Sequence, residues 1–343
     1  MGAAREPAAK GPRSSSAPAT SAANASSASS ASSANRSVLD VALLSFGGPR
    51  SLVEIPEFMV RLTGAEAPPE LLRVVEEKYA AVGGASPLME ISEHIAQALE
   101  ATLVQRLGFV VRVRPGYLHT RPSVAETLAG LDAHDVLALS LSPYTSRLTT
   151  DTYKKALAET GRADVPLIEG WSADPQYVQA ISERVARVLD GRESSEYALL
   201  FTAHNVPEET ILGGDPYADE IQHTISQLVP LIMPGDWRLG WQSKGRRGEA
   251  RWLEPEVEDV ALRFAAQGWR KLLVVPVGFV CDNVETLYDL DIVLRKVVEE
   301  AGMHYLRSEP ANDSPRCIAA LADAVIKYLA LRPLPGSSQP AAG

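Results

Sequence analysis

The sequence of 343 residues has only two cysteines, and neither has the spacing of a metal site or a disulfide framework. Cys281 and Cys317 lie in no CxxC motif and have no histidine partner, which excludes a zinc ribbon and a self-contained iron–sulfur cluster. No apolar run reaches the roughly 18 residues that a membrane-spanning helix needs. We therefore expect a soluble body in a reducing compartment, with a cytoplasmic location.

Nucleotide-binding signatures are also missing. Neither GxGxxG nor GxxxxGK[ST] occurs, so Gly47-Gly48-Pro49 is interpreted as a tight structural turn and not as a phosphate loop. Acidic residues outnumber basic ones beyond residue 36. Residues 1–36 contain four basic residues and one acid and carry a charge of +3. The whole chain has a net charge of −10, so residues 37–343 carry −13. An acidic body argues against a nucleic-acid partner.

Both ends of the chain are poor in the residues that build a core. Residues 1–36 contain 12 Ala and 10 Ser but no Val, Ile, Leu or aromatic residue, which predicts a disordered extension. Their Ser-rich, basic composition also fits an organelle transit peptide, so targeting stays an alternative to a cytoplasmic location. Residues 332–343 are predicted to be a second disordered tail.

The body between these ends alternates short apolar runs with amphipathic segments. The runs predict buried strands at Val41–Phe46, Val110–Val113, Val136–Leu141, Pro166–Trp171, Tyr197–Ala203, Arg238–Trp241 and Leu272–Val277. Helical patterns separate them, including Pro69–Val82, Pro175–Leu189 and Val284–Gly302. This alternation predicts an α/β protein with parallel sheets covered on both faces. We expect two domains, 37–150 and 151–331, with the last helix packing back on the first.

Two residues with useful chemistry follow strands of the predicted second sheet. His204 comes directly after Tyr197–Ala203, and Glu285 comes shortly after Leu272–Val277. Ligands bind α/β sheets at the carboxyl ends of their strands. Asp289 stands four residues after Glu285, and such acids repel unless a cation or a proton separates them, although solvated helix caps give the same pattern. A facing imidazole and carboxylate could bind Fe²⁺ or remove a proton.

Several collinear segments of the body resemble the ferrochelatases. They are LLSFGGP (43–49), KYAAVGGASP (78–87), FTAHNVP (201–207), GDPY (214–217), WQS (241–243), WLEP (252–255), PVGFVCDNVETLYDLD (276–291) and AND (311–313). The resemblance runs from about Val38 to Leu331. It implies two Rossmann-like domains around a porphyrin cleft, the type II chelatase fold. It also implies a lyase of heme biosynthesis that inserts Fe²⁺ into a porphyrin with release of two protons.

The resemblance also implies roles for single residues. The family's metal-site histidine and essential glutamate fall on His204 and Glu285, which are expected to bind the metal and to act in catalysis, with Asp289 in support. Positions that contact the porphyrin fall on Phe46, Thr63, Lys78, Tyr79, Ser86 and Tyr153, with Arg147 as a further cation. Fe²⁺ is expected as a substrate, without a prosthetic group or an iron–sulfur cluster.

The sequence departs from the family's pattern at four of these places. Asn205 replaces a serine, and Asn283 stands where many members have a second histidine. Phe46 replaces an iron-ligating tyrosine of some coproporphyrin-using members, and Thr63 replaces a basic residue of those members. Coproporphyrin III and protoporphyrin IX therefore both stay open as substrates.

Two other functions are compatible with the same residues. One is insertion of cobalt or nickel into another tetrapyrrole, and the other is a non-catalytic heme or porphyrin carrier. The expected partners are the porphyrin and Fe²⁺, with a transient membrane or heme-acceptor contact as a further option. The sequence does not predict an oligomeric state.

Overall fold

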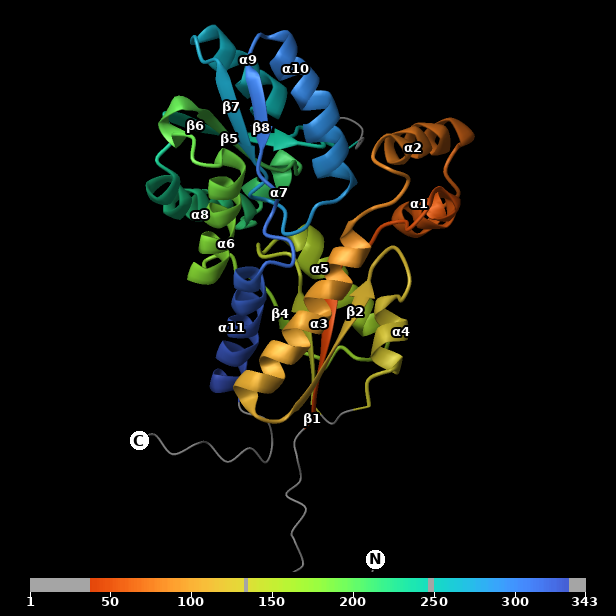
Figure 1. The fold of residues 1–343 in the computed structure, drawn as a ribbon. Coiled ribbons are helices and arrows are strands. Elements are labelled where there is room, and N and C mark those ends of the chain that lie inside the picture. Colours follow the sequence, from red (N-terminus) through yellow and green to blue (C-terminus); the bar gives the residue numbers. More distant parts are fainter. Residues whose placement is uncertain (1–37, 133–134, 246–249, 333–343) are drawn as a thin grey trace, which may run out of the picture. The chain divides into compact units, whose positions relative to one another are not determined.

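The strands of the second half repeat the arrangement of those in the first half. The computed structural model describes residues 38–132, 135–245 and 250–332, and within them the strands form two sheets, each of four parallel strands (Figure 1). The first sheet has the order β2-β1-β3-β4, with β1 (Val38–Ser45), β2 (Val110–Tyr117), β3 (Asp135–Ser140) and β4 (Leu167–Ile168). The second has the order β6-β5-β7-β8, with β5 (Ala198–His204), β6 (Asp236–Gln242), β7 (Lys271–Val275) and β8 (His304–Arg307).

Burial of the central strands explains why the apolar runs become parallel sheets. Leu39, Val41 and Leu43 of β1 are fully buried, and so are Leu199 and Phe201 of β5. A strand that is covered on both faces needs a continuous apolar run, and helices on both faces supply the cover. The predicted α/β class with two parallel sheets is confirmed. The predicted extension 1–36 and the tail from residue 333 onward lie outside the described residues.

The helices connect successive strands. In the first half they are α1 (Ile55–Thr63), α2 (Pro69–Ala81), α3 (Leu88–Leu107), α4 (Val124–Ala129) and α5 (Arg147–Glu159), with a short turn η1 (Leu52–Glu54) before α1. Next come α6 (Pro175–Leu189), η2 (Ser194–Glu196), α7 (Glu208–Leu212), α8 (Tyr217–Ile232), α9 (Val257–Ala266), the π-helical η3 (Glu285–Leu294), α10 (Arg295–Glu300) and α11 (Pro315–Leu331). None of the described helices combines the length and apolar character needed to cross a membrane.

The last helix contacts both halves. α11 packs against α6 and against α3 of the first half, beside which it lies in Figure 1. The predicted domain boundary near residue 150 falls between β3 and β4 of the first sheet. This sheet extends to Ile168, because β4 pairs with β3 beyond residue 150. The described residues from Val38 onward belong to one compact unit. The division into domains 37–150 and 151–331 stays a prediction.

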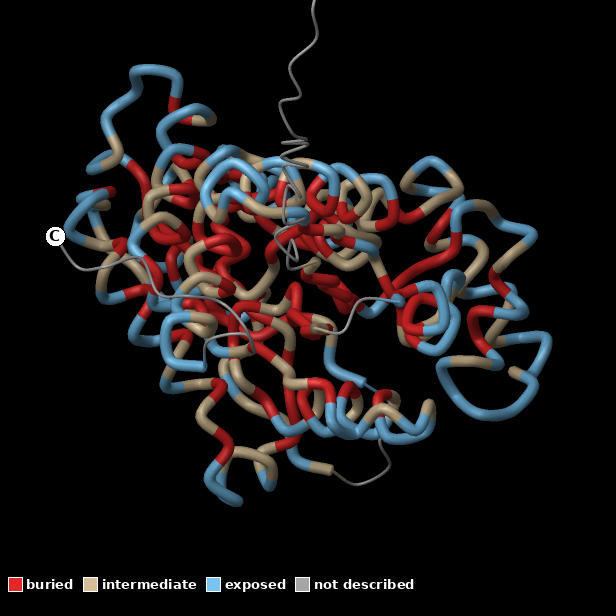
Figure 2. The backbone as a smooth tube through the Cα atoms, turned by 90° about the horizontal axis from the view of Figure 1, so that it is seen from below, coloured by how far each residue is buried: buried red, intermediate tan, exposed pale blue. Residues whose placement is uncertain are grey.

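Two tyrosines join the carboxyl ends of the two sheets. Tyr144, which follows β3, donates a hydrogen bond to the carbonyl of Val277 at 3.0 Å, and Tyr177 of α6 donates to the same oxygen at 3.3 Å. Both rings are buried in a core that also contains residues of β1 and β5. Figure 2 shows that the buried backbone runs through the interior and that the exposed backbone lies on the outer turns. The loop after β7 is thereby fixed beside the loop after β3.

Candidate active site

The register of the second sheet places His204 and Glu285 at the same edge. His204 ends β5 opposite Gln242 of β6, and β7 ends nearby at Val275. The chain then passes close to β5 at Gly278, where an added Cβ would lie 2.5 Å from the Cβ of Ala203. Only glycine permits this approach. It directs the following residues across the end of β5, so that η3 begins beside His204.

The two side chains form a half-buried pair. His204 Nε2 lies 3.3 Å from Glu285 Oε1, with side-chain exposures of 39% and 31%. His204 Nδ1 donates to the carbonyl of Asn205 at 2.6 Å, which fixes the ring and directs Nε2 toward Glu285. When Nε2 carries no proton, its lone pair and the carboxylate point at the same space. That pair of donors suits a borderline divalent metal.

The pair is charged at neutral pH. Burial acts to lower the pKa of His204, but the charge and hydrogen bond of Glu285 outweigh it and raise this pKa to about 9. Burial would raise the pKa of Glu285, yet His204 and Lys78 lower it below its usual value. The resting site is therefore an imidazolium–carboxylate pair. Metal binding has to displace the imidazolium proton, so it depends on pH.

Asp289, one turn further along η3, has partners on both sides. Lys78 Nζ of α2 lies 2.8 Å from Asp289 Oδ1 and 5.3 Å from the centroid of the Tyr288 ring. Ser243, which follows β6, donates a short hydrogen bond to the other carboxylate oxygen. Lys78 therefore contacts the segment that carries Glu285. Within the described residues, no group of three or more His, Cys, Asp and Glu side chains could hold a metal ion.

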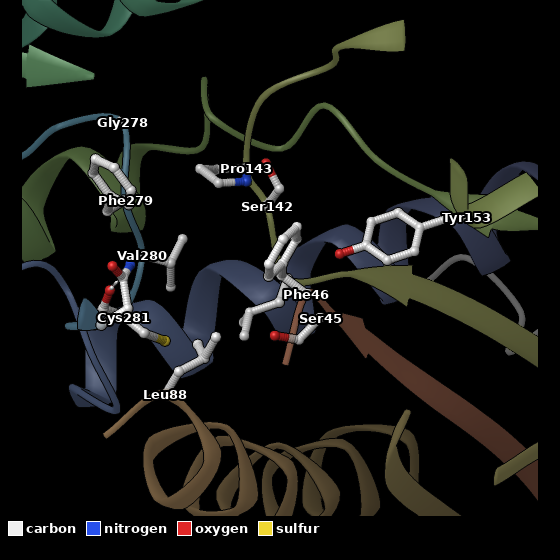
Figure 3. Close-up of a pocket in the computed structure, with 12 residues that line it drawn as sticks. Ser45, Phe46, Leu88, Ser142, Pro143, Tyr153, Gly278, Phe279, Val280 and Cys281 are labelled. Atoms are coloured by element: carbon white, nitrogen blue, oxygen red, sulfur yellow. Dashed lines mark hydrogen bonds between the residues drawn. The ribbon is translucent and has the colours of Figure 1, made fainter. Parts of the chain in front are cut away.

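A pocket of about 150 Å³ lies between the strand ends of the two halves (Figure 3). Phe46 and Tyr153 line it from the first half and Phe279 lines it from the second, with the Tyr153 hydroxyl pointing toward Phe46. The Phe279 ring lies 6.5 Å from the His204 ring, and Asn283 also lines the pocket. Two of the predicted porphyrin contacts are thus brought together next to the charged pair.

The other predicted contacts lie around this centre in different settings. Tyr79 is buried against Phe58, and burial together with the charge of Glu285 raises its pKa. Ser86 is buried against Gly48, where an added Cβ would lie 2.8 Å from the Ser86 Cβ. The Thr63 hydroxyl lies 2.8 Å from the carbonyls of Met59 and Ala65, so its proton is engaged at the end of α1. Arg147 is exposed at the start of α5.

Both asparagines that depart from the family pattern have structural partners. Asn205 is buried, and its side chain bonds to the backbone N–H and the carbonyl of Leu253, both at 3.0 Å. Asn283 Oδ1 accepts from the backbone N–H of Glu285 at 2.8 Å, and its amide donates to the carbonyl of Cys281. Asn205 therefore holds the neighbouring loop, while Asn283 fixes the backbone at the start of η3.

One residue next to the pocket was missed at the sequence level. His119 lies 4.4 Å from Phe46, centroid to centroid, and its Nδ1 bonds to the carbonyl of Arg61 at 3.2 Å. Burial lowers its pKa, so the ring is neutral at pH 7. The rule that selected His204 would also have selected His119. The predicted strand ended at Val113, however, whereas β2 continues to Tyr117.

The two sheets of four parallel strands, each flanked by helices, have the type II chelatase fold. In line with this class, the fold matches that of the chelatase SirB from Bacillus subtilis, solved with Fe³⁺, with a TM-score of 0.53 at 9% identity. That match covers 85% of this chain and 95% of SirB. The likeness shows the fold alone.

The sequence comparisons give the family. A ferrochelatase family model matches residues 40–329. A ferrochelatase of Geobacter metallireducens is 33% identical over 314 residues, covering 84% of this chain and 97% of the relative. A coproporphyrin III ferrochelatase of Geobacillus thermodenitrificans is 31% identical over 310 residues, covering 86% and 97%. The chain belongs to the ferrochelatase family, the lyases that insert a metal ion into a porphyrin in heme biosynthesis.

Proposed function

We propose that this chain inserts Fe²⁺ into a porphyrin and that His204 and Glu285 carry the chemistry. The observation that supports this most directly is the 3.3 Å pair of His204 Nε2 and Glu285 Oε1 beside a pocket lined by residues of both halves. A metal that is passed on to four pyrrole nitrogens needs only transient ligands from the protein. A single imidazole and a carboxylate meet that need.

The proton balance follows from the charged resting state of the pair. Insertion replaces two pyrrole protons by one Fe²⁺, so two protons must leave the site. His204 first releases its own proton, and its free Nε2 binds Fe²⁺ together with Glu285. As the iron moves to the ring, Nε2 accepts one pyrrole proton and the Glu285 carboxylate accepts the other. His204 keeps its proton because its pKa is raised to about 9, whereas Glu285, whose pKa is lowered, releases the other to solvent and restores the charged pair. Together with the proton that His204 gave up at the start, two protons have then left the site.

The pocket supplies the surface against which the macrocycle is gripped. Phe46 and Tyr153 on one wall and Phe279 on the other offer apolar faces to a flat ring. Phe46 remains 43% exposed, so part of its ring is free to contact a ligand. Binding energy from the ring periphery can be used to bend the macrocycle, which exposes the pyrrole nitrogens to the metal.

The substrates and partners are proposed together with the reaction. Relatives named coproporphyrin III ferrochelatase make that porphyrin a candidate beside protoporphyrin IX. Lys78, Ser86 and Arg147 are proposed as donors to the ring's carboxylates. We propose no prosthetic group. Cys281 and Cys317 are both buried free thiols.

Anaerobic mixing of the protein with Fe²⁺ and each porphyrin, followed by the absorbance change of metallation, tests this function. We expect metallation by the wild type and none by His204→Ala, which should still quench porphyrin fluorescence on binding. His223→Ala is the matched control, because His223 is an exposed histidine on α8. Binding without metallation by the wild type would identify a carrier, and metallation only with Co²⁺ or Ni²⁺ would identify the other chelatase.

A further inference from the structure

Several residues of other elements bond to the segment from Asp282 to Asp291, which carries Glu285, and three of them hold its carboxylates in addition to Lys78. Ser243 after β6 bonds to Asp289, Arg307 of β8 bonds to Asp282 and Asp291, and Asn312 before α11 bonds to Asp282. We call Ser243, Arg307 and Asn312 the clamp. The segment begins η3, whose π-helical turns are rare and occur frequently at functional sites.

Arg307 provides the most buried part of the clamp. Its side chain is 9% exposed, and its Nε and Nη2 donate to the two oxygens of Asp291 at 2.8 and 2.7 Å. Its Nη1 donates to Asp282 at 2.9 Å. A planar guanidinium fixes the direction as well as the distance of such contacts. Arg307 therefore fixes the segment at two points, one on each side of Glu285.

Asn312 holds the same end of the segment through two bonds. Its Oδ1 accepts from the backbone N–H of Asp282 at 2.9 Å, and its amide donates to the Asp282 carboxylate at 3.1 Å. The other oxygen of that carboxylate accepts from the Thr286 hydroxyl at 2.9 Å. The Asp282 carboxylate thus connects Asn312 and Arg307 through hydrogen bonds to Thr286, the residue next to Glu285.

Two clamp residues, Ser243 and Asn312, have a backbone conformation that favours glycine, which indicates that their side chains are required at these positions. Among the described residues, four other than glycine have a positive φ: Asp190, Met233, Ser243 and Asn312. Asp190 and Met233 end α6 and α8, a usual place for this conformation. Ser243, at φ 59°, and Asn312, at φ 48°, do not end helices. Glycine would adopt these angles with less strain, but it could not bond to Asp289 or Asp282.

We propose that Ser243, Arg307 and Asn312 are positioning residues that keep Glu285 within hydrogen-bond distance of His204. This proposal rests on the proposed function, in which that pair handles the metal and the protons. Gln242 adds to the same arrangement, because its amide donates to Ser243 Oγ at 3.3 Å and to the carbonyl of Glu285 at 3.4 Å. None of the three clamp residues acts on the substrate. Each acts through the acid that it holds.

The test compares Ser243→Gly, Asn312→Gly and Arg307→Lys with the wild type. Met233→Gly is the matched control, because it removes the same backbone strain at an exposed helix end without a bond to η3. Two quantities are measured: the kcat and KM of metallation, and the NMR titration of His204 in the ligand-free protein. The titration needs no substrate, so it tests positioning even if the wild type proves to be inactive.

We expect Ser243→Gly and Arg307→Lys to lower kcat about tenfold or more with little change in the porphyrin KM, because misplacing a reacting group by 1 Å can cost about 100-fold. In the same variants the pKa of His204 should fall from about 9 toward its ordinary value, because Glu285 moves away. Met233→Gly should change neither quantity. An unaltered His204 titration in folded Ser243→Gly and Arg307→Lys would overturn the proposal. Asn312→Gly serves as a further variant if Arg307→Lys fails to fold.

Discussion

Lys78 Nζ lies 2.8 Å from Asp289 Oδ1, so a residue predicted to bind the porphyrin's carboxylates already has a carboxylate partner within the protein. The pair joins α2 of the first half to η3 of the second. Both side chains are roughly three-quarters buried, at 27% and 21% exposure. A substrate carboxylate that binds Lys78 has to share the ammonium with Asp289 or displace it.

Replacing Lys78 should weaken porphyrin binding, and replacing Asp289 should strengthen it. Lys78→Met should raise the porphyrin KM about fivefold, which corresponds to ~1 kcal/mol for a partly exposed charge pair. Asp289→Asn should lower KM, since it leaves Lys78 free for the substrate. Steady-state metallation at varied porphyrin concentration measures both. Lys155→Met, at an exposed lysine of α5, is the control, and an unchanged KM in Lys78→Met would argue against a carboxylate contact.

The charged His204–Glu285 pair should stabilise the fold in a defined pH window. The raised pKa of His204 means that its contribution is complete below about pH 6.5, the ordinary histidine value, and is lost as the pH rises through about 9. The lowered pKa of Glu285 means that its contribution is lost only as the pH falls through the acid range. In urea unfolding, the wild type should have a higher free energy of unfolding than Glu285→Gln at pH 6. This difference should be smaller at pH 10. A difference that does not depend on pH would contradict the ion pair.

Metal binding without porphyrin should tighten as the pH rises. Zn²⁺, which has no redox chemistry, has to displace one proton from His204, so its apparent Kd should fall about tenfold per pH unit between pH 6 and 8. Calorimetry in two buffers of different ionisation enthalpy would count the released proton. His204→Ala should bind weakly and without this slope. Release of no proton by the wild type would mean that His204 is not a ligand.

Asn205 should matter for stability more than for chemistry. Asn205→Ala removes both bonds to the Leu253 backbone and leaves buried polar groups unpaired, which should lower the free energy of unfolding by about 1–3 kcal/mol. Gln222→Ala, at an exposed position of α8, should cost less than about 0.5 kcal/mol. Denaturant melts measure both. A loss of activity in Asn205→Ala without a loss of stability would place Asn205 in the chemistry instead.

Much of the fold could be predicted from local sequence signals. α6 was predicted with its observed bounds, Pro175–Leu189, because the Asp174 side chain caps it and proline takes its first position. β8 was missed because His304–Arg307 is short, carries a polar side chain at each end, and has only Tyr305 buried. The π-helical form of η3 was also missed, since its apolar spacing predicts an ordinary helix.

The sequence by itself determined the α/β class, the family and the positions of His204 and Glu285 after strands. Buried strands can be predicted from local apolar runs, and the family from motifs in the same order along the chain. Only the tertiary structure decided that their side chains meet, since a contact between residues 81 positions apart depends on sheet register and on the close passage at Gly278. It also decided the partners of Lys78 and Asn205. Long polar side chains can reach several partners, and packing alone selects among them.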